Sequence, residues 1–284
     1  VKRRRNFRKK ERVFKNNNLK KTDIVYKLLT VVVANQKGGV GKTTTALNLA
    51  ASLSAASRKV LLIDLDSQKN ASSASGVDNI TSKLSLLDAL VDDKPINSLI
   101  LKTDYKFDII PASQDLISAE MELMNANNPT SILKEKLSVI KNKYDYLVLD
   151  CPPSLGMLSV SALRAADKVL IPLQCEYYSL EGLAAMNQTI GEINASTGDK
   201  IKISVILRTM FDARNKSARE VSSELEKHFP KELCSTIIPR NVRLSEAPSY
   251  GMPALYYEPE AKGTIAYLAL AGELINKYEK NNAA

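Results

Sequence analysis

The stretch KGGVGKTT, residues 37–44, carries the residue types that bind a phosphate chain. An apolar run at 28–34 precedes it, and a helical pattern at 45–57 follows it. It fits the pattern G-x-x-x-x-G-K-S/T in a tightened form, in the order Lys37, Gly38, Gly39, Val40, Gly41, Lys42, Thr43, Thr44. In this order a strand brings the chain to a sheet edge, glycines let backbone N–H groups turn inward, and the helix N-terminus adds its dipole. The sequence therefore predicts a loop that binds a nucleoside triphosphate.

Two side chains of this loop have predicted roles. Lys42 is expected to reach the β- and γ-phosphates, and the Thr43 hydroxyl is expected to ligate Mg²⁺. The alternative is a glycine-rich turn that binds nothing. Because the flanking strand and helix are the context that confirms this motif, we favour the phosphate site.

Three aspartates lie at or just beyond the ends of two apolar strands. Asp64 ends the run 60–64, Asp66 lies in the loop beyond it, and Asp150 ends the run 146–150. A carboxylate at such a place is costly unless it is paired or holds a metal. We predict that Asp150 and Asp64 hold the water shell of Mg²⁺ and that Asp66 orients the attacking water. The alternative for each is a helix N-cap or a turn residue.

Short β-branched runs alternate with longer amphipathic ones, which predicts an α/β fold: a doubly wound, mostly parallel sheet flanked by helices. Ligands of such sheets bind beyond the carboxyl ends of the strands. Strands are expected at 30–35, 60–64, 107–111, 146–150, 168–172, 201–207 and 235–238. Helices are expected at 43–57, 114–125, 130–142, 157–166, 180–195, 217–228 and 264–278.

The positive charge is concentrated at one end of the chain. The net charge of the 284 residues is +9, but residues 1–30 hold 12 Lys+Arg against 2 Asp+Glu, and the rest holds 28 against 29. We therefore predict a basic, disordered arm at 1–27 and a single domain at 28–284. The arm is expected either to bind an anionic partner, such as DNA or a membrane, or to be a solvated end.

The cysteines and the apolar runs bear on where the protein acts. Cys151, Cys175 and Cys234 are widely spaced and form no C-x-x-C pair, which favours a reduced, cytoplasmic protein. No run approaches the roughly 18 apolar residues that a membrane span needs.

The chain resembles the ParA/Soj-type partition ATPases, a deviant Walker A branch of the P-loop NTPases. The resemblance runs from about Val31 to the last helix, through ANQKGGVGKTTTALNLA, KVLLIDLD, YDYLVLDCPPSLG, IPLQCEYYSLEGL, TMFDAR and IPRNVRLSEAPSYG. It implies a weak ATPase whose cofactors are ATP and Mg²⁺, which dimerises with ATP and binds double-stranded DNA non-specifically. It also implies a ParB-like partner that stimulates hydrolysis, an association with the nucleoid and no membrane.

The resemblance also implies residue roles. Lys37 matches a lysine that reaches across the dimer to the nucleotide of the other subunit, and Pro239 and Asn241 join the nucleotide-binding set. The residues implied for DNA binding are Arg214, Arg240 and Arg243. The alternative is that these arginines are solvated or pair with carboxylates such as Asp212 or Glu246.

Four residues depart from the usual family pattern. Ser67 stands in place of Pro and Lys69 in place of Gly, which puts the turnover rate in doubt more than ATP binding. Ser161 replaces Asn, and Arg208 replaces Thr. Arg208 is expected either to add to the DNA surface or to alter the nucleotide pocket.

Three rival functions remain open from the residues. One is a MinD-like positioning ATPase held to membrane by a C-terminal amphipathic helix, but the last helix carries Glu273 and Glu279 rather than a basic stripe. A second is an iron–sulfur carrier with Cys151 and Cys175 as ligands, although neither cysteine sits in a cluster motif. A third is a DNA-binding regulator that is set by nucleotide and has negligible turnover.

Overall fold

The computed structural model of the chain describes residues 28–77, 85–124 and 128–279, so the predicted arm at 1–27 lies outside the described residues. The described residues form an eight-stranded sheet in the order β3-β4-β2-β5-β1-β6-β7-β8. The strands are β1 (Leu29–Val33), β2 (Val60–Asp64), β3 (Leu101–Lys102), β4 (Asp108–Ile110), β5 (Tyr146–Asp150), β6 (Lys168–Gln174), β7 (Ile203–Phe211) and β8 (Leu233–Pro239).

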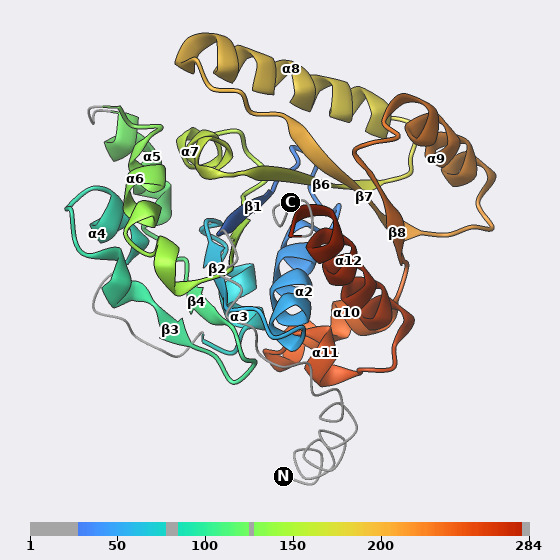
Figure 1. Cartoon of the computed structure of the whole chain (residues 1–284), viewed down its shortest axis with the longest axis horizontal. Helices are drawn as coiled ribbons and strands as arrows, with labels where there is room; N and C mark the ends of the chain where they lie inside the picture. Colours follow the sequence, from blue (N-terminus) through green and yellow to red (C-terminus); the bar gives the residue numbers. More distant parts are fainter. Residues whose placement is uncertain (1–27, 78–84, 125–127, 280–284) are drawn as a thin grey trace, which may run out of the picture.

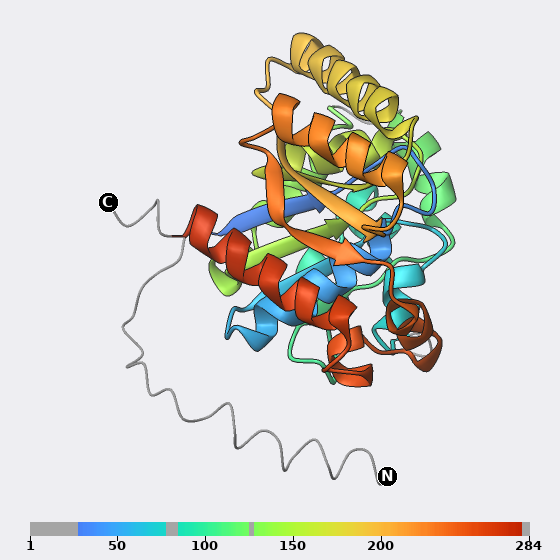
Figure 2. The same cartoon turned by 90° about the vertical axis from the view of Figure 1, so that its right-hand side faces the viewer.

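The sheet is parallel except at β3, which pairs antiparallel with β4 at one edge. Figure 2 shows the arrows of the parallel strands pointing the same way. In the centre, Val33 of β1 and Asp64 of β2 both stand in register with Asp150 of β5. The carboxyl ends of these three strands therefore lie side by side, as the prediction of a common site requires.

Helices cover both faces of the sheet (Figure 1). They are α2 (Lys42–Ala55), α3 (Asn70–Ala74), α4 (Leu86–Leu90), α5 (Leu116–Met124), α6 (Ile132–Ser138), α7 (Met157–Ala165), α8 (Ser179–Thr197), α9 (Lys216–His228), α10 (Val242–Glu246), α11 (Ala254–Tyr257) and α12 (Lys262–Tyr278). Three 3-10 helices connect them: η1 (Ile96–Leu99), η2 (Lys141–Lys143) and η3 (Ala247–Tyr250).

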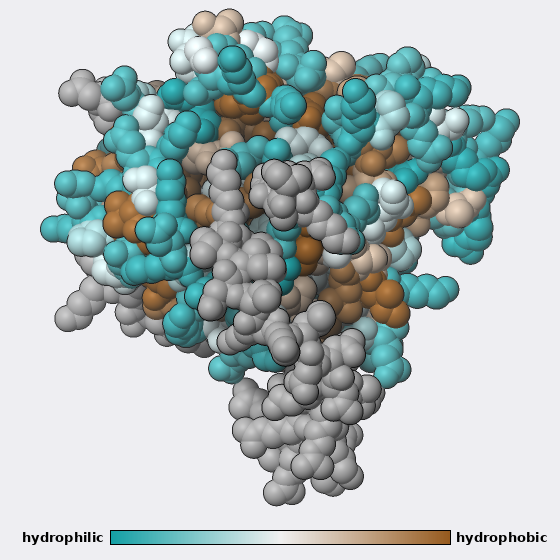
Figure 3. All heavy atoms as spheres, in the orientation of Figure 1, coloured by the Kyte–Doolittle hydropathy of each residue, from teal (hydrophilic) through white to brown (hydrophobic). Residues whose placement is uncertain are grey.

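Two separate apolar cores form because successive residues of a strand point to opposite faces. Val32 packs with residues of α4–α9, whereas Val31 and Val33 pack with residues of α2, α3 and α10–α12. Strands covered on both faces must be apolar almost throughout, which explains the unbroken runs in the sequence. On the face that Figure 3 shows, hydrophobic residues appear as separate areas among hydrophilic ones.

The last helix, α12, docks into the core. Its buried side includes Tyr267, whose hydroxyl lies 3.1 Å from the Thr45 hydroxyl of α2. Glu273 accepts hydrogen bonds from the backbone of β8, and Glu279 accepts two from Arg58 at 2.7 and 2.9 Å. The acidic face of this helix is thus used inside the protein. Within the described ranges, no helix has the length and apolar character to cross a membrane.

The predicted fold class is confirmed, and each predicted strand and helix is present with ends shifted by a few residues. The sequence analysis missed β3, α3, α4, α10 and α11, none longer than five residues. A helix of five residues shows little more than one turn, so no hydrophobic periodicity could reveal it.

The contact between α12 and α10 leads to a test of the packing. A Cβ added at Gly263 would lie 2.7 Å from two buried side-chain carbons of Leu244, whereas one at Gly272 of the same helix meets nothing within 4 Å. We expect Gly263→Ala to lower the free energy of unfolding by about 1–3 kcal/mol through overpacking. Gly272→Ala is the matched control and should raise it by up to about 1 kcal/mol through helix propensity. Urea unfolding of both variants measures this, and equal effects would contradict the packing described.

Candidate active site

The phosphate-binding loop joins β1 to α2, as predicted. Gly39 and Gly41 adopt φ values of 74° and 90°, a left-handed conformation that favours glycine. Helix α2 starts directly after Gly41, whose carbonyl accepts the Thr45 N–H at 2.9 Å. Gly39 and Gly41 are therefore favoured by the backbone turn, and the turn delivers the chain to a helix N-terminus.

Lys42 is the buried cation of the loop. Only 8% of it is exposed, and its Nζ donates a hydrogen bond to the Lys37 carbonyl at 3.1 Å. Burial lowers the pKa of Lys42, while the nearby charges of Asp150 and Asp66 act in the opposite direction. The ammonium group is thus held between the loop and the predicted carboxylates, where the phosphates of a nucleotide would supply further negative charge.

Asp150 is fully buried at the end of β5, and neither of its carboxylate oxygens has a hydrogen-bond partner among the described residues. The pKa of Asp150 is raised well above its usual value, first by burial and then by the charge of Asp64 on the neighbouring strand. The nearby Thr43 hydroxyl lowers the pKa of Asp150 in part. It does not form a hydrogen bond of good geometry with either oxygen. Such a carboxylate is costly unless a cation or a donor comes to it.

Asp64 has the same burial but different partners. Its Oδ1 accepts the Asp66 N–H at 3.1 Å, and its Oδ2 accepts the N–H and the hydroxyl of Ser72 at 2.8 and 2.7 Å. Burial raises the pKa of Asp64 to about 6 despite these bonds. Ser72 was not singled out from the sequence. Asp64 is thus already satisfied by the protein.

These residues fit a magnesium ion. The Thr43 hydroxyl and the unsatisfied Asp150 oxygens are hard oxygen donors beside a phosphate loop, which is the setting that Mg²⁺ prefers. When bound there, the ion would neutralise charge on the phosphates. The ion would offset the cost of burying the Asp150 carboxylate without a partner. For Asp64 a share in the magnesium site stays a prediction.

Asp66 sits at the start of the loop after β2 and is 8% exposed. Its Oδ1 accepts the Gln68 N–H at 3.0 Å, so one oxygen has the turn role that the sequence left as an alternative. Lys69, where the family usually has Gly, adopts a left-handed φ of 56°. Such a conformation is unfavourable for a residue with a Cβ, so the loop that holds Asp66 carries local strain. The catalytic role of Asp66 stays a prediction.

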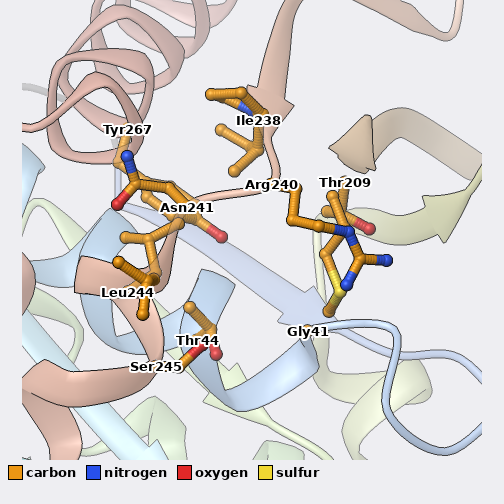
Figure 4. A pocket seen from close by; sticks show the side chains of 12 residues that line it. Gly41, Thr44, Thr209, Ile238, Arg240, Asn241, Leu244, Ser245 and Tyr267 are labelled. Atoms are coloured by element: carbon orange, nitrogen blue, oxygen red, sulfur yellow. The ribbon is translucent and has the colours of Figure 1, made fainter. Parts of the chain in front are cut away.

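A pocket of about 320 Å³ opens beside the phosphate loop. Pro239 and Asn241, both predicted, line it together with Arg240, which was predicted for DNA instead. Figure 4 shows Arg240 near Gly41 and Thr209, with Asn241, Leu244 and Tyr267 around the other side. The pocket is continuous with the loop at Gly41 and Thr44, so a nucleoside attached to the phosphates would enter it.

Several residues that line this pocket were not predicted from the sequence, namely Thr209, Met210, Leu244, Ser245 and Tyr267. Thr209 also donates a hydrogen bond from its hydroxyl to the Val40 carbonyl at 2.8 Å. Thr209 and Met210 lie near the carboxyl end of β7, so the rule that located the aspartates could have found them. Tyr267 comes from the last helix, and no sequence signal connects it to the loop.

Lys37, predicted to act across a dimer, is held within its own chain. Its Nζ lies 2.5 Å from a carboxylate oxygen of Glu176, which follows β6. Both side chains are about half exposed, at 42% and 54%. Exposed ion pairs of this kind are weak, so Lys37 can leave Glu176 for another anionic partner.

Of the arginines predicted for DNA, Arg214 and Arg240 lie in the loops after β7 and β8 at one edge of the sheet, and Arg243 lies in α10, which follows. Arg214 pairs with Asp212 at 2.7 Å, and Arg243 pairs with Glu246 at 2.6 Å. These are the carboxylates that the sequence analysis named as alternative partners. Both arginines remain exposed, and their role in DNA binding stays a prediction.

Arg208 belongs neither to an exposed surface nor to the nucleotide pocket, so both expectations for it are wrong. It is 5% exposed and donates hydrogen bonds to Ser222, Glu226 and the Cys234 carbonyl at 2.7–3.0 Å. It therefore ties β7 to α9 and β8. Ser161 is also buried, and its hydroxyl donates to the Pro129 carbonyl at 3.3 Å.

The cysteines are free, buried thiols. Burial raises the pKa of Cys151 above its usual value and that of Cys175 to about 11. A metal-binding cysteine is a thiolate, which a raised pKa disfavours. This pair of side chains lends no support to the iron–sulfur alternative.

The unsatisfied carboxylate predicts a pH-dependent effect of Asp150→Asn. Because its folded pKa is raised, ionised Asp150 destabilises the nucleotide-free protein at high pH, and the penalty disappears as pH falls and the group takes up a proton. Asp150→Asn should therefore raise the free energy of unfolding by about 1–3 kcal/mol at pH 8, with a smaller gain at pH 5. Urea titrations without nucleotide test this. A gain that is independent of pH would show that the charge is not the cause.

Comparison with known proteins gives a consistent assignment. A family model described as an AAA domain matches residues 28–203. The chromosome partitioning protein ParA of Myxococcus xanthus is 48% identical over 87% of this chain and 88% of its own length. The sporulation initiation inhibitor protein Soj of Bacillus subtilis is 44% identical over 86% of this chain and 97% of its own.

A solved structure supports the same fold and site. Cobyrinic acid a,c-diamide synthase from Mycobacterium smegmatis, with bound ATP analog and magnesium, is 31% identical with a TM-score of 0.78. The similarity covers 89% of this chain and 97% of that one. Together with the phosphate loop and its aspartates, these matches show that the chain belongs to the ParA/Soj-type chromosome partitioning ATPases of the MinD/ParA superfamily.

Proposed function

We propose that this chain is an ATP-dependent DNA-partitioning protein. It binds ATP with Mg²⁺, dimerises, binds double-stranded DNA non-specifically, and is reset when a ParB-like partner stimulates hydrolysis. The observation that carries the proposal is the buried, unsatisfied carboxylate of Asp150 beside Lys42 and the phosphate loop. A buried carboxylate without a hydrogen-bond partner favours the binding of a cation, and a phosphate chain would bring that cation to it.

The roles of the chain's own residues follow from that placement. Backbone N–H groups of the loop bind the phosphates, and Lys42 neutralises their charge. Thr43 and Asp150 hold the magnesium ion. Asp66 orients the attacking water with the carboxylate oxygen that the turn leaves available, and the strain at Lys69 is consistent with slow intrinsic turnover.

Dimerisation is coupled to nucleotide through Lys37. In the single subunit Lys37 is paired with Glu176. The triphosphate of a second subunit offers a more concentrated negative charge than one carboxylate, so Lys37 exchanges partners when two nucleotide-loaded subunits meet. A cation supplied in this way makes the nucleotide part of the dimer interface, as an arginine finger does.

The DNA surface is formed by Arg214, Arg240 and Arg243, with the basic segment 1–27 as an auxiliary tail that places the protein on the nucleoid. Contacts of arginine to backbone phosphates give affinity without reading sequence. The membrane-positioning alternative is less favoured, because α12 is packed on the core and its two glutamates bind within the protein.

The hydrolytic role of Asp66 has a direct test. Asp66→Ala should bind ATP but lose at least about tenfold in turnover and therefore accumulate as a dimer with ATP, as judged by light scattering. Lys42→Ala is the contrasting variant and should lose nucleotide binding itself. Normal turnover in the Asp66 variant would exclude it as the water-positioning residue and leave open a regulator set by nucleotide alone.

The nucleotide switch is tested by DNA binding. Non-specific duplex DNA is titrated with ATP, with ADP and without nucleotide across a salt series, for the full chain and for a form that begins at Leu28. We expect ATP alone to switch on binding in both forms, with a steeper salt dependence for the full chain because its tail contacts additional phosphates. Binding that needs the tail and ignores nucleotide would contradict the proposed switch and favour the membrane-positioning alternative.

A further inference from the structure

Each of two exposed arginines on the proposed DNA surface is engaged by a nearby carboxylate, Arg214 within the loop after β7 and Arg243 within α10. Asp212 binds Arg214 through both oxygens, with Nε–Oδ1 at 3.0 Å and Nη2–Oδ2 at 2.7 Å, and it also accepts the Arg214 N–H at 3.0 Å. Glu246 binds Arg243 through a single Nη1–Oε2 contact of 2.6 Å. A paired guanidinium has fewer donors free for phosphate.

The two ion pairs belong to one continuous strip. Phe211 at the end of β7 pairs with Pro239 at the end of β8, and its carbonyl accepts the Arg240 N–H at 3.3 Å. Arg214 chiefly, and Arg240 to a smaller extent, hold the pKa of Asp212 down to about 2. Asp212 and Arg214 therefore lie near Arg240, and Arg243 and Glu246 follow Arg240 on α10; we call these five residues the arginine strip.

The charge of the strip is low for a surface that binds DNA. Its three arginines face two carboxylates, so only one net positive charge remains. Lys216 and Arg219 lie beside Arg214 on α9, but Lys216 is itself within 3.6 Å of Glu220. Duplex DNA carries two phosphates per base pair, and a carboxylate next to a phosphate is repelled. The carboxylates thus oppose binding in two ways, by occupying the arginines and by repelling the ligand.

The two ion pairs can break in favour of another anion, because the fold does not depend on them. The Arg214 side chain is 91% exposed and that of Arg243 47% exposed, and water and salt screen pairs of this kind. Neither arginine is needed to satisfy a buried group. By contrast, Arg208 is buried, donates to the buried Ser222 hydroxyl and Cys234 carbonyl, and holds three elements together. Phosphates can therefore displace Asp212 and Glu246 without disturbing the fold.

We propose that Asp212 and Glu246 are built-in competitors of DNA phosphate, which hold Arg214 and Arg243 in the free subunit and yield them to backbone phosphates of duplex DNA. This inference rests on the proposed function and adds a means of control to it. By weakening the contact that one subunit can make, the two carboxylates keep a lone subunit off DNA. A dimer that presents two strips gains the second contact at high effective concentration and binds.

The test uses the full chain with the double substitution Asp212→Asn and Glu246→Gln. Both changes keep an oxygen that accepts a hydrogen bond from the neighbouring arginine and remove only the charge. The matched control is Asp93→Asn combined with Glu135→Gln, which also removes two charges, one of them paired with Lys136, far from the strip. Asp93 adopts a left-handed φ of 57°, which Asn tolerates. Affinity for a non-specific duplex is measured with ATP, with ADP and without nucleotide at several salt concentrations, together with ATP affinity.

We expect the double variant to bind duplex DNA about tenfold more tightly than the wild type at low salt, in the ADP and nucleotide-free states as well as with ATP. The gain should shrink as salt rises, and ATP affinity should stay unchanged. Unchanged DNA affinity in the double variant, while the wild type binds DNA with ATP, would overturn the competitor role and leave the proposed function standing. An equal gain in the double control, which changes the net charge by the same amount, would also overturn it, because net charge would then be the cause. No DNA binding by any form would overturn both proposals.

Discussion

The desolvated carboxylate of Asp150 is the constraint around which the centre of this protein is built. Asp64 and Asp150 end adjacent parallel strands in register, so two acidic groups are forced together where no water reaches them. Ser72 satisfies Asp64, whereas the oxygens of Asp150 find no hydrogen-bond partner in the part of the chain that the structure describes. The cost is borne because the glycine turn brings Lys42 and a helix N-terminus to the same point, and a cation with its phosphates would remove it.

The basic side chains that are proposed to bind nucleotide or DNA form ion pairs with carboxylates of the same chain. Lys37 is paired with Glu176, Arg214 with Asp212 and Arg243 with Glu246. Each pair is at least partly exposed, so each can be exchanged for a phosphate at little cost in stability. The free subunit is then a state in which the proposed contacts to nucleotide and to DNA are already satisfied internally. The binding free energy of a ligand therefore reflects only how much more strongly its phosphates bind these cations than the carboxylates do.

Features that depend on the order of residues within one short segment could be predicted from the sequence. The phosphate loop, Asp64 and Asp150 were found because each lies at the end of an apolar run, and the ends of parallel strands meet. Contacts between distant segments were not visible. Tyr267 meets Thr45 across 222 positions, and Lys37 meets Glu176 across 139. Arg208 was misread because the residues that bury and pair it lie on α9 and β8, where no pattern around position 208 reveals them.

The segment from Pro239 to Glu246 links the two proposed activities physically. Its first residues line the pocket beside the phosphate loop, and its arginines form half of the strip. The other half follows β7, whose Thr209 is hydrogen-bonded to the Val40 carbonyl of the loop. Both parts of the strip, the residues after β7 and those after β8, are thus connected to the candidate nucleotide site by short stretches of chain. The residues that line the pocket and the arginines proposed for DNA therefore share one short segment, and a substitution in that segment is expected to affect both proposed activities.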